Sequence, residues 1–478
     1  MNNIDKELIA EFEKLPDDFW DFKNSDTKEL THSVHNYPAV MVYPISRNII
    51  SIMKKYQKIE SLLDPFMGSG TVLLEGMLAN IGRIYGNDLN PLAHRISKAK
   101  TTLLNEQLNE YEDDCISRIE EKYQYYAQIL NEIRDYITEA GYDITAKVNE
   151  KGNWGENAPA ILNAYLQEKA VDMRIPDIKN LGFWFVPKCA LELEIIKECI
   201  TGIENIDIRD YFMLAFSETT RLVSNRRNGE FKMYRMKPEK VLEYNPDVKK
   251  TFFQILSANV DKMEQLRERV KEKNDSTITF SFEDASNLSA VPDDSIDLVV
   301  TSPPYGDSRT TVAYGQFSRV SLQWCDYEQL SYKDIIDIDK SLMGGTTYKK
   351  GFNFDLNSET LKSALDEILQ VEGNLERAGD VYSFYKDLEA ILGTVTRKCR
   401  KNSYQYWVVG NRTVKNVQLP TDEILVEMGE KFGLHHVTTL GRTISNKVMP
   451  SENSPTNETG KKVKTMNKEL IVVFRKEY

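Results

Sequence analysis

Two short motifs contain the residues best suited to chemistry. Residues 64–71 read DPFMGSGT, an acid followed by a glycine-rich turn whose backbone N–H groups can hold a small charged ligand. Residues 301–306 read TSPPYG, where two prolines fix the backbone and remove two N–H donors. What remains in the second motif is a stiff loop of acceptors beside an aromatic face. The pair therefore indicates a cofactor site next to a site for a planar group that bears an amine.

The residues around the first motif predict the front half of a nucleotide-binding α/β fold. Residues 61–64 end a short apolar run and are followed by Pro and Gly, which predicts a strand that stops at a tight turn. Residues 71–80 predict a helix with one apolar face, and residues 82–88 predict a second strand that ends in an acid. Strand, glycine turn, helix, strand and acid follow one another in this order in such folds.

Three acids follow three predicted strands. Asp64 opens the glycine turn, where its charge would repel a pyrophosphate but suits a ligand with a positive end, such as S-adenosylmethionine. Asp88 stands where an acid accepts from both ribose hydroxyls, and Asp284 is placed to accept from the adenine amino group. Each acid alone is also explained as a helix cap or a surface charge, and a lone Gly-x-Gly turn is weak evidence. As a set they predict S-adenosylmethionine as the cofactor.

The second motif follows a predicted buried strand, residues 295–300, and so lies at the edge of the sheet beside the predicted cofactor pocket. An exocyclic amine on a base is a poor nucleophile because its lone pair is delocalised into the ring. Acceptors on both N–H bonds, here the Ser302 side chain and the Pro303 carbonyl, would draw that nitrogen toward tetrahedral geometry. Pro304 stiffens the loop, and Tyr305 offers a face on which a flipped base can stack. The alternative is a Pro-Pro turn with a packed tyrosine.

Both motifs resemble those of the amino-methyltransferases that modify exocyclic nitrogens of DNA bases. HNYPAVMVYP at residues 35–44 also resembles the segment that closes over the methionine part of their cofactor. The resemblance implies an α/β, Rossmann-like class I S-adenosylmethionine-dependent methyltransferase fold, here with a large helical insertion. It implies cofactor contacts from Tyr37, Pro38, Asp64, Pro65, Phe66, Gly68, Gly70, Thr71, Asp88, Asn90, Asp284 and Thr301. It implies a catalytic site formed by Ser302, Pro303, Pro304 and Tyr305.

The resemblance also narrows the substrate. In that family a serine before the two prolines usually accompanies cytosine-N4 acceptors, and aspartate or asparagine accompanies adenine-N6, so Ser302 favours cytosine-N4. We therefore expect a site-specific methyltransferase of double-stranded DNA, the partner of a restriction endonuclease that acts on the same site. Adenine-N6 methylation of DNA and guanine-N2 methylation of tRNA or rRNA are the alternatives, and RNA enzymes generally have aspartate at this position. The intact catalytic motif disfavours an inactive DNA-binding subunit.

The long interval between the motifs predicts a separate domain. At 478 residues the chain is expected to form two or three domains. Periodic apolar residues predict one or two helices at 103–142, further helices at 183–208, 210–223 and 251–273, and further strands at 277–282, 404–409 and 470–474. We expect the N-terminal segment and the cofactor half at 1–104, a helical target-recognition domain at 105–270, and the catalytic half at 271–478 with a smaller insertion around 327–380.

The charge distribution indicates where nucleic acid binds. The net charge of −12 excludes a uniformly basic coat, but residues 221–237 hold six basic residues and one acid. Phosphate contacts come from such clusters because fields from exposed charges fade over about 8–10 Å in physiological salt. The predicted nucleic-acid contacts are Arg221, Arg226, Arg227, Lys232 and Arg235. A solvated face is an equally plain interpretation of any one such run.

Other features of the sequence exclude several classes of protein. No apolar run approaches the roughly 18 residues of a membrane span, and the N-terminal residues lack the pattern of a signal peptide. The five cysteines are scattered, without a CxxC pair or a histidine at ligand spacing, so neither disulfides nor a metal site are expected. We expect a cytoplasmic protein, bacterial or archaeal, that associates with the nucleoid.

Overall fold

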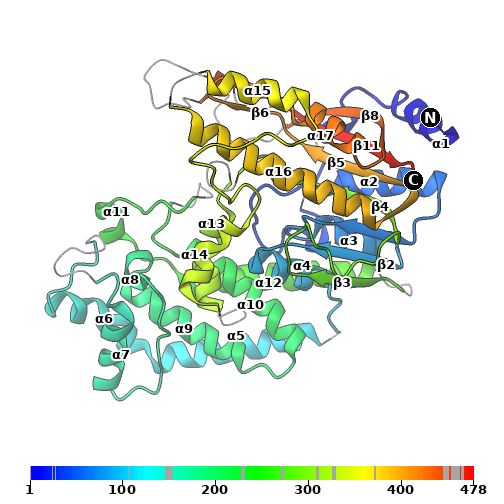
Figure 1. The fold of residues 1–478 in the computed structure, drawn as a ribbon. Coiled ribbons are helices and arrows are strands. Elements are labelled where there is room, and N and C mark those ends of the chain that lie inside the picture. Colours follow the sequence, from blue (N-terminus) through cyan, green and yellow to red (C-terminus); the bar gives the residue numbers. More distant parts are fainter. Residues whose placement is uncertain are drawn as a thin grey trace.

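A seven-stranded sheet forms the centre of the protein (Figure 1). In spatial order its strands are β3 (Thr277–Ser281), β2 (Arg83–Asn87), β1 (Ser61–Asp64), β4 (Ile296–Thr301), β5 (Cys399–Val409), β11 (Lys468–Lys476) and β8 (Leu434–Thr443). The computed structural model describes residues 2–23, 25–26, 28–105, 107–145, 154–227, 232–270, 274–307, 312–325, 330–370, 373–444, 452–453, 463–464 and 468–478.

The order of the strands defines the fold class. Strand β1 pairs in parallel with β2 and β4, β2 with β3, and β4 with β5. Strand β11 lies between β5 and β8 and is antiparallel to both. Apart from β11, this is the strand order of a Rossmann sheet. In such a sheet the strands that follow the first are added on one side of it, and the later strands are added on its other side. The expected α/β fold of the class I S-adenosylmethionine-dependent methyltransferase type is confirmed.

Helices cover both faces of the sheet because successive strand residues point to opposite sides. Leu62 and Leu298 belong to one hydrophobic core, whereas their neighbours Leu63 and Val299 belong to another. The first core is closed by α2 (Tyr43–Tyr56), α3 (Thr71–Leu78) and α4 (Pro91–Thr101). The second is closed by α15 (Glu359–Leu369), α16 (Leu375–Lys398) and α17 (Thr421–Glu430).

The chain between α4 and β3 forms a helical lobe, which lies to the lower left of the sheet in Figure 1. Its helices are α5 (Leu108–Tyr125), α6 (Ala127–Glu139), α7 (Ala158–Glu168), α8 (Leu181–Trp184), α9 (Pro187–Thr201), α10 (Ile206–Leu222), α11 (Pro238–Glu243) and α12 (Val248–Arg269). The predicted helix over 183–208 is wrong in two respects, because the helix is interrupted between α8 and α9 and again between α9 and α10. Pro187 opens α9 and keeps Val186 extended, which ends the preceding helix.

The remaining elements lie around the sheet and between it and the lobe. Helix α13 (Tyr314–Cys325) packs against α10 of the lobe and against α14 (Tyr332–Ser341). The others are α1 (Asn3–Phe12), η1 (Phe19–Asp21), η2 (Leu30–Ser33) and the small hairpins β6–β7 (Arg412–Val414, Val417–Leu419) and β9–β10 (Glu452–Asn453, Val463–Lys464).

Among the described helices none is long and apolar enough to cross a membrane. The described residues contain no group of three or more metal-binding side chains, and all five cysteines are free and buried.

Candidate active site

The two motifs meet in one cavity at the carboxyl ends of the central strands. The Thr301 hydroxyl at the end of β4 donates a hydrogen bond to Asp64 Oδ1 at the end of β1, at 2.6 Å. The predicted cofactor residues that line the cavity are Tyr37, Pro38, Asp64, Pro65, Phe66, Gly68, Thr71, Asp88, Asn90 and Asp284. Ser302 and Pro304 line the same cavity. The carboxyl edge beside the first strand is where such folds bind ligands.

The glycine bend, residues 64–71, is shaped by its backbone. Gly68 and Gly70 have φ angles of +48° and +74°, which side chains rarely adopt. A Cβ atom on Gly70 would also lie 2.8 Å from Ser97 Oγ and 2.9 Å from Ser97 Cα on α4. Gly70 immediately precedes the first residue of α3, so its backbone angles set the direction of that helix relative to β1. It does not itself line the cavity, and its role is to let the bend pass close to α4.

Two carboxylates at strand ends face the cavity, Asp64, which is buried, and Asp88, which is partly buried. Burial raises the pKa of Asp64 to about 7 and that of Asp88 to about 6, although hydrogen bonds from Thr301 and from backbone N–H groups oppose these shifts. Glu283, Asp284 and Asp387 are also among the lining residues, while no Lys or Arg belongs to the described part of the wall. Such a wall repels a pyrophosphate and attracts a cationic ligand.

Asp88 and Asn90 fix the geometry of the second strand end. Asp88 Oδ2 accepts from the Gly68 backbone N–H at 3.0 Å, so it joins β2 to the glycine bend. Asn90 Oδ1 caps α4 by accepting from Leu92 N, and its Nδ2 donates to Tyr37 Oη at 3.1 Å. Asn90 is fully buried, and its contacts position Tyr37 at the cavity wall. Asp284 is exposed at the rim.

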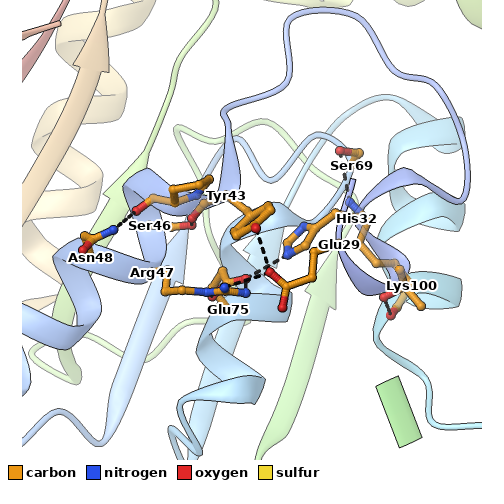
Figure 2. A network of polar contacts seen from close by, with 11 residues as sticks. Glu29, His32, Tyr43, Ser46, Arg47, Asn48, Ser69, Glu75 and Lys100 are labelled. Carbon is orange, nitrogen blue, oxygen red and sulfur yellow. Dashed lines mark hydrogen bonds and ion pairs between the residues drawn. The ribbon is translucent and has the colours of Figure 1, made fainter. Parts of the chain in front are cut away.

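The segment 37–41, here called the strap, lines the cavity. The elements before and after it are both bonded to Glu75, which is buried on α3 (Figure 2). On one side Glu75 Oε1 accepts from His32 Nε2 of η2 at 2.8 Å, and burial lowers the pKa of that histidine. On the other side Arg47 of α2 donates from Nε to Glu75 Oε2 at 2.8 Å. The Glu75 carboxylate on α3 therefore joins η2, which precedes the strap, to α2, which follows it.

A buried lysine contacts the glycine bend from behind. Lys100 Nζ on α4 donates to Ser69 Oγ at 3.4 Å, and Ser69 lines the cavity (Figure 2). Burial lowers the pKa of Lys100 to about 7. Sequence alone gave this lysine no role, because its burial depends on how η2 and α4 pack.

The loop at residues 301–307 contains the predicted catalytic residues and is called the catalytic loop below. It is held by side chains that come from distant elements. Asp307 is fully buried and accepts from Arg377 Nη1 of α16 at 3.1 Å and from Arg412 Nη1 of β6 at 3.2 Å. Arg412 is also buried, and its guanidinium lies over the Phe384 ring. Pro303 and Tyr305 do not line the cavity, and the Tyr305 hydroxyl turns away to Glu469 on β11. The loop thus depends on ion pairs formed across the fold.

Several lining residues were missed by sequence reasoning. They are Ala39, Val40, Met41, Met67, Ser69, Val72, Asn87, Leu89, Glu283, Ala285, Ser286, Tyr314, Ser341, Leu342, Met343, Asp387, Ala390 and Ile391. Val40 and Met41 belong to the strap, whose motif already placed it over the cofactor. Asp387 comes from α16 and accepts from Gly344 N at 2.8 Å, a contact that no local pattern indicates.

The predicted nucleic-acid residues lie apart from the cavity, on the helical lobe. Arg221 is buried in α10, bonded to Glu218 of the same helix, and Arg226 is 2% exposed. Arg235 donates to the carbonyls of Ile144 and Thr145 and lies over the Phe183 ring. These three arginines are engaged inside the lobe, so we propose no direct phosphate contact for them. Residues 228–231 of the run lie outside the described residues.

Three basic residues of the run remain accessible, and one of them is the exposed Lys237. Arg227 is exposed with its guanidinium over the Tyr234 ring, and Lys232 is partly exposed. Glu218, the partner of Arg221, also accepts from Asn36 Nδ2 at 2.6 Å. The helical lobe is therefore in direct contact with the residue that precedes the strap.

Comparison with known proteins gives one strong relative. A type II methyltransferase from Kocuria varians, M.MvaI, is 38% identical over 487 residues, which cover 99% of this chain and 98% of the relative. No family model matches the chain. A DNA modification methylase from Thermus thermophilus (18% identity, 41% of this chain and 51% of that chain, TM-score 0.20) and the rRNA methyltransferase aviRa from Streptomyces viridochromogenes (10%, 92% and 88%, TM-score 0.29) are similar solved structures. Both TM-scores are too low to support an argument.

Proposed function

Since the chain belongs to the type II methyltransferase family, we propose that it methylates an exocyclic amine of a base flipped out of double-stranded DNA. The proposed acceptor is cytosine N4, and the proposed biological role is to protect DNA from a restriction endonuclease that acts on the same site. The observation that carries the proposal is the shared cavity, whose wall contains both the acidic strand ends and Ser302.

The acidic wall fits S-adenosylmethionine. When bound, this cofactor supplies a methyl group on a positively charged sulfur. Asp64 would accept from its amino group, Asp88 from the ribose hydroxyls and Asp284 from the adenine amine. The contacts of Asp64 and Asp88 support this assignment, because Asp64 accepts from Thr301 and the Phe66 N–H, and Asp88 accepts from the N–H groups of Gly68 and Asn90, all of them uncharged donors. The strap would cover the methionine part.

The catalytic loop supplies acceptors for the target amine. Ser302 faces the cavity, and the Pro303 carbonyl follows it in a backbone that the two prolines keep rigid. Two acceptors on the two N–H bonds orient the nitrogen and increase electron density on it, which is the main help a protein can give to such a nucleophile. Ser302 favours cytosine N4 over adenine N6.

The decisive experiment measures methyl transfer directly. Purified protein is incubated with methyl-labelled S-adenosylmethionine and, in parallel, with unmodified genomic DNA or with bulk tRNA and rRNA. We expect label in DNA, recovered as N4-methylcytosine at one short sequence after nucleoside analysis and base-resolution mapping. N6-methyladenine at a defined sequence would keep the DNA activity and overturn the choice of base. Label in RNA alone would overturn the choice of substrate.

A matched variant tests the proposed division of roles. Ser302→Ala removes a side-chain acceptor from the cavity and leaves the acidic wall intact. We expect slower transfer to DNA with unchanged affinity for S-adenosylmethionine, measured by calorimetry. Equal transfer rates in the variant and the native protein would contradict the role given to Ser302.

A further inference from the structure

A directed chain of hydrogen bonds leads away from Ser302. The Tyr305 hydroxyl lies 2.9 Å from Glu469 Oε1, and Ser302 Oγ lies 3.4 Å from the Tyr305 hydroxyl. An ionised carboxylate can only accept, so the single proton of the Tyr305 hydroxyl is committed to Glu469. The Ser302 proton must then point to the tyrosine oxygen. The lone pairs of Ser302, which lines the cavity, are left for a donor in that cavity.

The far end of this chain is firmly anchored. Glu469 on β11 stands directly opposite Arg442 on β8, and the two side chains form an ion pair with 13% and 6% exposure. Arg442 Nε also donates to the Trp20 carbonyl at 2.9 Å. An ion pair that is shielded from water is stable when further hydrogen bonds satisfy its remaining polar atoms. The bonds from Tyr305 and to the Trp20 carbonyl have this effect on the pair of Glu469 and Arg442. Burial, with the nearby charge of Glu469, raises the pKa of Tyr305 well above its ordinary value, so the tyrosine remains a donor.

We propose that Glu469 is a positioning residue for methyl transfer, which acts through Tyr305 to make the Ser302 hydroxyl an acceptor toward the target amine. The inference rests on the proposed function. Without Glu469 the Tyr305 hydroxyl is free to donate to Ser302, and the serine proton then turns toward the cavity. A hydroxyl that donates to the nitrogen lone pair opposes attack, whereas one that accepts from the N–H promotes it.

The test is a double-mutant cycle on the rate of a single turnover with saturating DNA and S-adenosylmethionine. Glu469→Ala should slow transfer about tenfold, the size expected when one oriented hydrogen bond is lost. The equilibrium constants for S-adenosylmethionine and DNA should change less than twofold. In the Tyr305→Phe background the same substitution should have no further effect, because the connection to Ser302 is already broken. Equal effects in both backgrounds would overturn the proposal.

Two further variants separate positioning from folding. Glu469→Gln keeps an oxygen that can accept from Tyr305 and should restore most of the rate, whereas a purely structural ion pair with Arg442 would not be restored. Glu477→Gln removes a charge just beyond β11, where the side chain is 46% exposed and paired with Arg475, and should leave the rate unchanged. If the native protein transfers no methyl group at all, the proposed function fails. If it transfers and Glu469→Ala matches it, only this inference fails.

Discussion

The glycine bend and the catalytic loop lie next to each other, yet they are held in place by different means. The bend owes its shape to backbone angles at Gly68 and Gly70 and to close packing on α4. The loop owes its position to carboxylates and guanidinium groups that reach it from α16, β6 and β11. Local sequence therefore specifies the first, and the completed tertiary structure specifies the second. Four predictions test this contrast.

The largest effect is expected at Asp307. Replacement by alanine leaves the Arg412 guanidinium buried without its carboxylate, and breaking a buried pair in this way costs about 3–5 kcal/mol of unfolding free energy. Urea denaturation should show this loss as a lower midpoint. Glu243→Ala is the control, since it removes the partner of the exposed Lys240 and should hardly move the midpoint. Equal midpoints for both variants would contradict the anchoring role.

A smaller effect is expected at Gly70. Gly70→Ala combines a left-handed backbone angle with a clash against Ser97, and should lower the unfolding free energy by about 2–3 kcal/mol. Gly141→Ala has the same kind of angle, φ +80°, but no atom within 4 Å of the added Cβ, and should cost only about 1 kcal/mol. The difference between the two variants in the same denaturation assay isolates the close approach. If the two costs are equal, packing on α4 does not shape the bend.

The acidic wall makes a prediction about pH. Asp64 has a raised pKa of about 7 in the free protein and must be ionised to accept from the cofactor amine, so binding releases its proton below that pH. Affinity should therefore fall as pH decreases, by about tenfold between pH 8 and pH 6, with a smaller contribution from Asp88. Calorimetric titration of S-adenosylmethionine at several pH values measures this directly. Asp64→Asn should bind more weakly and lose most of the pH dependence, and an unchanged dependence would refute the assignment.

The smallest effect is expected on the surface of the helical lobe. Arg227→Gln and Lys232→Gln should each weaken DNA binding about twofold to threefold and reduce the slope of affinity against salt by about one. Binding titrations at several salt concentrations provide both values. Arg221→Gln is the contrasting variant, because its guanidinium is bonded to Glu218 and should affect stability more than the salt slope. A loss of salt dependence in Arg221→Gln would restore it as a phosphate contact.

The predictable parts of the molecule are those encoded locally. The strand at 61–64, the bend and the acid Asp88 follow one another within about 25 residues, so spacing alone places them correctly. The engagement of Arg221 was also readable, since Glu218 precedes it by three residues in a predicted helix and the two share one helix face. The count of basic residues over 221–237 left this pairing out, because Glu218 lies before that range.

The unpredicted parts depend on sheet order and register. Glu469 adjoins the predicted strand 470–474, but its neighbours Tyr305 and Arg442 follow from the insertion of β11 between β5 and β8. A shift of one residue in that register would send the glutamate to the opposite face. Asp387 likewise reaches the cavity only because α16 crosses the second face of the sheet. No short sequence pattern carries such information.

The position of β11 between β5 and β8 has a consequence for synthesis on the ribosome. Among the described strands, β8 pairs only with β11, so this edge of the sheet has no neighbour to join until residues 468–476 have been translated. The bend, the strap and the helical lobe emerge long before that point, and domains generally fold in the order in which they emerge. We expect a growing chain to form its cofactor pocket first. The contacts that support Tyr305 should form only when β11 inserts between β5 and β8.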